Sequence, residues 1–311
     1  MARSSNACVS SAGMSTESRR RTVEWPTVAL LASFAAAWLA LVLGHESVPW
    51  WAAAPAMVYM GGLWMSFGHE LLHGHPTRWN WVNGAVGWLP LSMWLPFSRY
   101  KYWHVVHHFA DLTDPIEDPE SFYVTPSDWE RRTRLGRAWT LLLRTAPGRV
   151  LLGPWRAIPR FWLGEVRCLG ERRIVSQWLV QVVLAVSFGW WIFGIVGYPW
   201  LEYVLCFVIG GSSCTHLRSF VEHQAVASGT RSAVVKAGPV MSLLFLNNNL
   251  HHTHHAQPDL AWYRLPAAHR RLGSDALAVD GAGFYPGGYL QVIRTYFFRP
   301  FHQPVHPLPR P

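Results

Sequence analysis

The sequence predicts an all-α integral membrane protein, with four transmembrane helices in two hairpins and a helical cap on the cytoplasmic side. Half of the 311 residues are hydrophobic and only 14% are charged, and the 19 tryptophans far exceed what a soluble domain of this size usually has. Several uncharged runs are also long enough to cross a bilayer. These runs argue against a soluble, basic nucleic-acid-binding fold, so we expect no nucleic acid, and the net charge of +9 is expected to face anionic lipid.

The four expected spans are residues 27–44, 49–68, 174–197 and 200–217. The first carries no charge, and at 1.5 Å per residue it covers about 27 Å, close to the hydrocarbon thickness of a bilayer. The short segment HESVP leads into the second span, which returns the chain to its starting side. Gly197-Tyr198-Pro199 separates the third span from the fourth, which gives the second hairpin.

The distribution of lysine and arginine predicts the orientation. Residues 98–173 contain thirteen of them, whereas the connections 45–49 and 197–200 contain none. Basic residues accumulate on the cytoplasmic side, so both termini and the middle segment are expected there. We expect a disordered cytoplasmic tail over 1–24, a membrane domain over 25–300 and a Pro-rich tail over 301–311.

Two further segments are expected to lie at the membrane surface. Residues 79–98 are uncharged and long enough to span, but Pro90 and Pro96 disfavour a straight helix, so an interfacial or re-entrant segment is expected. A full crossing would also place the first two histidine clusters on opposite faces. Between residues 128 and 165, tryptophans and leucines alternate with arginines, as in amphipathic helices that lie on a membrane.

The histidines form three clusters in the sequence, and each has helical spacing. His69 and His73 stand at i and i+4, an arrangement that is weak evidence when it is isolated. HxxHH then occurs twice, and these copies are hard to attribute to a surface patch. The register of the second copy stays open, because His252 and His255 also stand at i and i+3. The two copies comprise His104, His107 and His108, and His251, His254 and His255.

Imidazoles without thiolates suit zinc, copper, iron or nickel. A structural zinc ion needs only four ligands, so eight clustered histidines imply two metal ions. The four cysteines have no CxxC spacing, which argues against a zinc ribbon, an iron–sulfur ligand set or a disulfide framework.

In the order and spacing of these boxes and spans, the chain resembles the membrane fatty acid desaturase and hydroxylase superfamily, whose boxes are HxxxH, HxxHH and HxxHH. The runs HELLHGHPTR, LTDPIEDPES and NNNLHHTHHAQPDLAWYRLP resemble most the bacterial branch that includes the dihydrorhizobitoxine desaturase and rhizopine-catabolism proteins. The resemblance implies a bacterial inner-membrane enzyme with two iron ions on the cytoplasmic side and O2 as co-substrate.

The family uses a ninth histidine after the last span, and His223 fits that place. Where some animal desaturases have an asparagine four residues earlier, this chain has Ser219, which puts a water-mediated ligand there in doubt. No catalytic residue beyond the metal ligands is implied. The implied ligands are His69, His73, His104, His107, His108, His223, His251, His254 and His255.

Several polar residues near the boxes are candidates to support these ligands, because a ligating imidazole usually donates its second N–H to a carboxylate or a carbonyl. His75 and His216 are instead expected to be packing or interfacial residues. The supporting candidates are Glu70, Asp111, Asp114, Asp118, Ser219, Glu222, Asn247 and Asp259.

The expected activity is O2-dependent desaturation of a fatty acyl chain or lipid. Hydroxylation remains an alternative, because desaturation and hydroxylation use the same boxes. Oxidation of a small non-lipid metabolite at the same site is a further alternative. A metal transporter and a zinc hydrolase are weaker alternatives.

Because the chain has no iron–sulfur ligand set or fused cytochrome, a separate electron donor is expected: ferredoxin, or a cytochrome with its reductase. Arg99, Lys101 and the arginines of 131–137 would offer it a basic surface, and Trp64, Trp88, Trp94 and Phe97 are candidates to line an apolar substrate tunnel.

Overall fold

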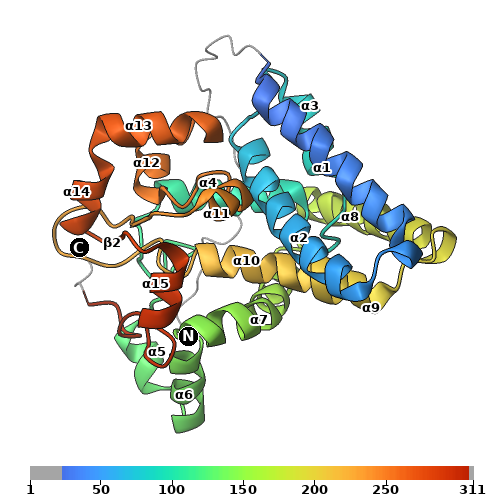
Figure 1. The fold of residues 1–311 in the computed structure, drawn as a ribbon. Helices are drawn as coiled ribbons and strands as arrows, with labels where there is room; N and C mark the ends of the chain where they lie inside the picture. Colours follow the sequence, from blue (N-terminus) through green and yellow to red (C-terminus); the bar gives the residue numbers. More distant parts are fainter. Residues whose placement is uncertain (1–22, 308–311) are drawn as a thin grey trace.

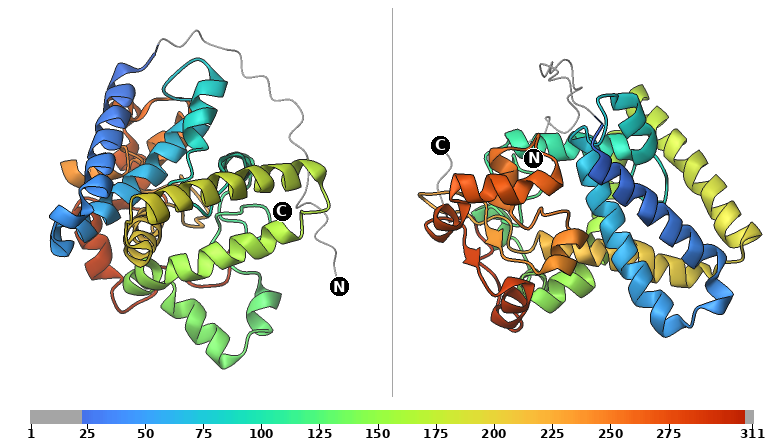
Figure 2. Two further views of the ribbon diagram at one scale, coloured as in Figure 1. Left: turned by 90° about the vertical axis from the view of Figure 1, so that its right-hand side faces the viewer. Right: turned by 45° about the horizontal axis from the view of Figure 1, so that its top comes forward.

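The computed structural model describes residues 23–307 of the protein, and it is mostly helical (Figure 1). The long helices gather at one end of the molecule, and the short helices of the C-terminal third lie at the other end (Figures 1 and 2). The elements of the N-terminal half are α1 (Trp25–Leu43), η1 (His45–Ser47), α2 (Trp50–Leu72), α3 (Asn80–Gly87), α4 (Phe97–Phe109), α5 (Pro126–Glu130), α6 (Arg134–Leu142) and α7 (Ala146–Val166).

The second half begins with a long helix and ends with short elements (Figure 1). Its elements are α8 (Arg172–Gly189), η2 (Trp190–Ile195), α9 (Trp200–Glu202), η3 (Tyr203–Gly210), α10 (Gly211–Arg218), β1 (Val234–Val235), α11 (Pro239–Leu244), α12 (His251–Ala256), η4 (Trp262–Arg264), α13 (Leu265–Leu272), α14 (Ser274–Val279), β2 (Phe284–Tyr285) and α15 (Gly288–Thr295).

Within residues 23–307, two helices are long and apolar enough to cross a membrane, Trp25–Leu43 and Arg172–Ile195. The second is α8 continued by the π-helical η2. Leu179, Val183 and Val186 are more than 60% exposed on it, an apolar stripe that lipid would cover.

The spans expected over 49–68 and 200–217 do not pass the same test. Helix α2 is 23 residues long, but its tryptophans, its glycines and Pro55 lower its mean hydropathy. Residues 200–218 are divided into α9, the π-helical η3 and α10. Both segments are helical and pack against each other. A Cβ at Gly61 of α2 would lie 2.0 Å from the carbonyl oxygen of Phe207, so this approach requires a glycine.

Residues 79–98 do not form a transmembrane helix. They contain α3, whose eight residues extend only about 12 Å, followed by turns up to the start of α4. Pro96 precedes α4 in an extended conformation, which ends the turns and starts the helix that carries the second histidine box.

The prediction of an all-α fold misses two short parallel strands, β1 and β2. Val234 pairs with Phe284 and Val235 with Tyr285. Runs of two residues are too short to show the alternation that identifies a strand in a sequence. The pairing ties the segment before the third histidine box to the C-terminal helices.

Arg99 does not contribute to a basic surface. It is only 5% exposed, and its guanidinium donates to Glu165 of α7 at 2.6 and 3.0 Å. The indoles of Trp103 and Trp178 donate to the same carboxylate. This buried ion pair connects α4 to α7 and α8.

The ends of the described chain are packed against the body. Residues 1–22, most of the expected disordered tail, and residues 308–311 lie outside the described residues. Glu24 contacts His75 Nδ1 at 2.8 Å, and Phe301 belongs to the main hydrophobic core. Val124 also pairs with Val305.

Candidate metal centre

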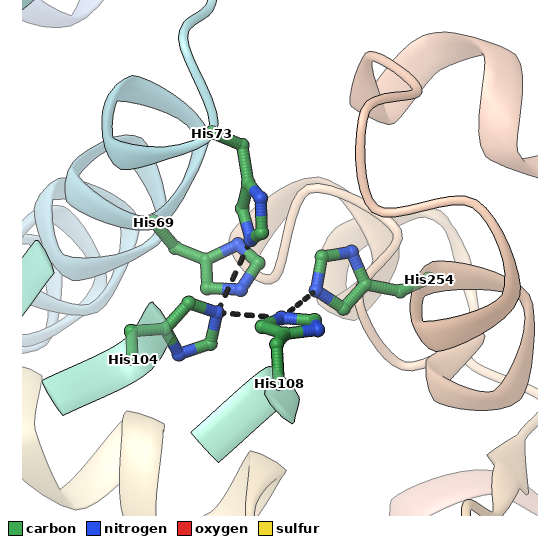
Figure 3. Close-up of side chains that lie close together, drawn as sticks. All are labelled: His69, His73, His104, His108 and His254. Atoms are coloured by element: carbon green, nitrogen blue, oxygen red, sulfur yellow. Dashed lines mark hydrogen bonds between the residues drawn. The ribbon is translucent and has the colours of Figure 1, made fainter. Parts of the chain in front are cut away.

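The first histidine cluster contains five rings from three helices. His69 lies in the last turn of α2, with His73 directly after it, His104 and His108 are one turn apart on α4, and His254 lies on α12. The i, i+4 spacing directs each pair to one side of its helix. One potential ligand atom from each ring lies within 4.8 Å of all the others, and Figure 3 shows the rings facing a common centre.

The second cluster contains His107, His223, His251 and His255. Helices α4 and α12 therefore contribute to both clusters. In each HxxHH box the second of the three histidines, His107 or His254, belongs to a different cluster from the other two. His223 follows α10, and its Nδ1 lies 3.2 Å from the carbonyl oxygen of Arg231, to which an Nδ1–H would donate. That tautomer leaves the Nε2 lone pair directed at the cluster.

The spacing of the nitrogens suits ligands that share a metal ion. In the first cluster, His104 Nε2 lies 3.1 Å from His73 Nε2 and 2.9 Å from His108 Nε2. In the second, His251 Nε2 lies 2.9 Å from His223 Nε2 and 3.1 Å from His255 Nε2. Ligands at right angles around an ion about 2.1 Å away would be about 3.0 Å apart. The donor sets thus fit two metal ions.

All the rings of the two clusters except His107 are also held in the neutral form that can bind a cation, because their pKa values are lowered. Burial lowers the pKa of His108 to about 3 and that of His223 to about 4, and it lowers the pKa of His251 and His254 well below its usual value. Neutral imidazoles keep a lone pair for a metal. For His107 burial also acts downward, but the charges of the surrounding carboxylates outweigh it and raise the pKa to about 9. The same negative charge favours cations in the site.

Three carboxylates support the rings from behind. Asp118 lies 2.7 Å from His107 Nδ1, and Glu222 lies 3.3 Å from His251 Nδ1. Glu120 lies 3.0 Å from His104 Nδ1, a contact that the sequence analysis missed. Glu120 lies in the turn that begins at Asp118, whose Oδ1 accepts from its backbone N–H at 2.9 Å, and a turn has no side-chain period from which this contact could be predicted.

An asparagine was assigned one position too early. Asn247 has a positive φ and donates to the carbonyl of Trp262, away from the rings. The neighbouring Asn248 lies 3.5 Å from His69 Nε2 and 3.2 Å from His251 Nδ1. A backbone reversal at residues 246 and 247 causes this shift, and helical spacing does not reveal it.

The remaining candidates have other partners or lie at the surface. Glu70 accepts a hydrogen bond from the backbone of Trp262, and Asp114 accepts two from the backbone of the following turn. Asp111 pairs with Arg231, Ser219 lies 3.4 Å from Arg149, and Asp259 is exposed in the turn after α12.

Three of the histidines that lie outside both clusters are close to the boxes or the spans in sequence. His75 is buried against Glu24, and His216 contacts the carbonyl of Ser212 in its own helix. His252 is partly exposed, on another side of α12 from the ligand-bearing side. The structure places His251, His254 and His255 of the third box in the two clusters, and His252 outside them.

Two pockets adjoin the centre from different sides. The apolar pocket is formed by Trp64, Met65, Gly68, Gly87, Ser92, Leu95, Phe97 and Tyr100. It lies next to the first cluster without being lined by its histidines, since Gly68 precedes His69 and the ring centroids of Tyr100 and His104 are 6.1 Å apart. The polar pocket reaches the second cluster and is formed by Thr113, Glu120, Ser121, Phe122, Tyr123, Ser219, Glu222, His223 and His302.

The comparison with known families agrees with this centre. The model of the fatty acid desaturase family matches residues 47–284, well over half of the chain. The chain belongs to this family. It is therefore a non-haem di-iron oxidoreductase of a membrane family. The beta-carotene ketolase of Paracoccus sp. (strain N81106 / MBIC 01143) is 28% identical over 253 residues, which cover 75% of this chain and 87% of the ketolase.

Proposed function

We propose that this protein oxidises an apolar substrate dissolved in the membrane, and that the substrate is the acyl chain of a lipid, which it desaturates with O2. The apolar side chains that line the pocket beside the first cluster carry this proposal, and because the pocket has room for only about one water molecule, its lining must move apart to admit a chain. The hydrocarbon part of an acyl chain has no polar group for a protein to recognise, so an apolar lining of suitable width is the expected means of positioning it.

Two iron ions would supply the activation of dioxygen that removes hydrogen from an unactivated carbon. The five rings around His104 would hold one, and the four around His251 the other. Asp118 and Glu120 hold their imidazoles in fixed orientations through Nδ1. Trp64 and Phe97 would hold the substrate chain, and Tyr100 lies between their pocket and His104.

Oxidation of a carotenoid is the second candidate, because the curated relative is a beta-carotene ketolase. A carotenoid is also apolar, so the pocket lining suits it as well. The apolar lining supports these substrates over a small polar metabolite of the kind handled in the rhizobitoxine and rhizopine branch. Hydroxylation of either substrate would use the same donor set.

For the membrane arrangement we propose four spans in two hairpins, within a domain of about residues 25–300 in a bacterial inner membrane. The packing of α2 against η3 and α10 supports pairing of the two less apolar segments inside the bundle. The thirteen basic residues of 98–173 support a cytoplasmic position for the centre. Short helices after the spans would then form the cap.

A separate electron donor is proposed, because each turnover that takes two electrons from the substrate needs two more from outside. Among the described residues, no cysteine belongs to a group of side chains that could hold a metal ion. Arg131 and Arg134 are exposed on the α5–α6 segment and offer a basic surface to an acidic electron donor. Anionic lipid headgroups are an equally suitable partner for this basic surface. Full turnover by the purified protein with O2 alone would contradict this proposal.

The test is expression in a bacterial host with matched lipid and carotenoid supplies, followed by mass spectrometry of both extracts. Desaturation predicts acyl chains lighter by two hydrogens, and ketolation predicts carotenoids heavier by one oxygen and lighter by two hydrogens. A protein with His104→Ala is the control for background activity. Metal analysis of the purified protein separates this function from zinc-dependent hydrolysis, since about two irons per chain are expected. Unchanged lipids and carotenoids in the presence of an iron-loaded protein would contradict the assignment of an apolar substrate.

A further inference from the structure

Helix α12 is the element on which the metal centre depends most. It supplies His254 to the first cluster and His251 and His255 to the second. It has only six residues and no side-chain cap, so it cannot fix its own orientation. An imidazole Nε2 lies roughly 7 Å from a helix axis, and a rotation of 10° would move it by about 1 Å.

Thr253 occupies the opposite side of this helix. At 100° per residue, the three ligand positions fall within roughly 100° of one another, and position 253 points away from their centre. The Thr253 side chain is fully buried, as is that of Ser274. Thr253 Oγ1 lies 2.9 Å from His269 Nδ1 and 3.0 Å from Ser274 Oγ.

The contacts continue from His269 to the surface. His269 is 5% exposed, and its Nε2 lies 2.8 Å from Asp275 Oδ1. Lys236, which follows β1, pairs with the other oxygen of Asp275 at 2.7 Å. The chain of polar contacts therefore links α12 to α13, to α14 and to the β1 segment. None of these side chains belongs to a histidine cluster.

The backbone hydrogen bonds that α12 makes to its neighbours do not hold the middle of the helix, which is left to the side chain of Thr253. Val235 donates to the carbonyl of Asn249 at 2.9 Å, and His252 donates to the carbonyl of Ala233 at 3.1 Å. Both bonds hold the N-terminal end of the helix. Thr253 holds the middle, on the side away from the metal centre, where a lateral contact resists rotation most directly.

We propose that Thr253, His269 and Asp275 form a positioning network that sets the rotation of α12, and through it the metal affinity of both clusters. The inference rests on the proposed metal centre and not on the identity of the substrate. A polar network is suited to this task, because its hydrogen bonds are directional, whereas apolar packing allows a short helix to turn.

The test is a metal-competition titration with a chelator on the full chain in detergent, using iron(II) under anaerobic conditions. Thr253→Val keeps the shape of the side chain and removes the hydroxyl, and Thr253→Ser keeps the hydroxyl. The matched control is Thr140→Val, since Thr140 is 4% exposed in α6, remote in sequence from every box. The thermal unfolding midpoint is measured for each protein.

We expect Thr253→Val to bind iron 10–100-fold more weakly than the wild type, the range for loss of a group that orients ligands. Thr253→Ser should restore binding to within a few-fold, and Thr140→Val should leave it unchanged. Wild-type affinity in Thr253→Val would overturn the inference. If Thr253→Val does not fold, Asp275→Asn at the exposed end of the network decides, and wild-type affinity in that variant would overturn it. Failure of the wild type to bind iron would instead count against the metal centre itself.

Discussion

Asp118 makes a sharp test of how the metal centre is held. Its side chain is 1% exposed, and its Oδ1 contacts His107 Nδ1 at 2.7 Å and the backbone N–H of Glu120 at 2.9 Å. Its Oδ2 accepts from the backbone N–H of Thr113 at 2.9 Å. All three partners are donors, so the site is built for a group with two acceptor oxygens.

Asp118→Asn keeps the shape but provides one acceptor and one donor. If the amide oxygen faces His107, the NH2 group opposes the N–H of Thr113, a buried mismatch of about 1–3 kcal/mol. If the amide is flipped, its NH2 faces His107 Nδ1, which must then accept. The proton moves to Nε2, and a protonated Nε2 cannot bind a metal. In either case we expect metal affinity to fall by about 10–100-fold.

The assay is iron content after purification, together with chelator competition in detergent. Asp111→Asn is the matched control, because Asp111 lies in the same loop, is about half exposed and pairs with Arg231. A surface ion pair contributes less than about 1 kcal/mol, so this variant should bind iron as the wild type does. Equal iron retention by the two variants would refute the reasoning.

Three further outcomes are expected. His254→Ala should reduce iron content by up to half and abolish turnover, whereas His252→Ala should keep the iron content and the turnover of the wild type. Metal analysis checks this, and loss of iron in His252→Ala alone would reverse the register of the third box. Gly68→Leu should shorten the accepted chain while iron content stays intact, because a side chain there enters the apolar pocket, where a Cβ would already lie 3.5 Å from the ring of Tyr100; product analysis with chains of graded length tests it, and an unchanged length profile would contradict it. Reporter fusions at residues 47 and 198 should report the outside, and fusions at 130 and 311 the inside; an outside signal at 130 would break the proposed topology.

Local patterns in the sequence were sufficient for the parts of the site that depend on one helix. The spacing of His104, His107 and His108 requires a helix, and α4 has its rings where that spacing predicts. The apolar runs at 25–43 and 172–195 are likewise local properties. A span was expected over 49–68, where α2 lies, but the glycines of α2 reflect close packing against η3 and α10, which hydropathy alone does not distinguish from a lipid-facing surface.

The sequence by itself determined that eight histidines on helical spacings could form an imidazole-rich centre in a membrane protein, and the resemblance to a family added His223. Only the tertiary structure decided how they divide, since His107 and His108 are neighbours on α4 yet belong to different clusters. It also decided that Glu120 and Asn248 contact the rings, and that Thr253 and His269 meet behind them. The reason is physical: side-chain direction along a helix follows from a local period, whereas the partner of each side chain depends on how separate helices and turns pack in three dimensions.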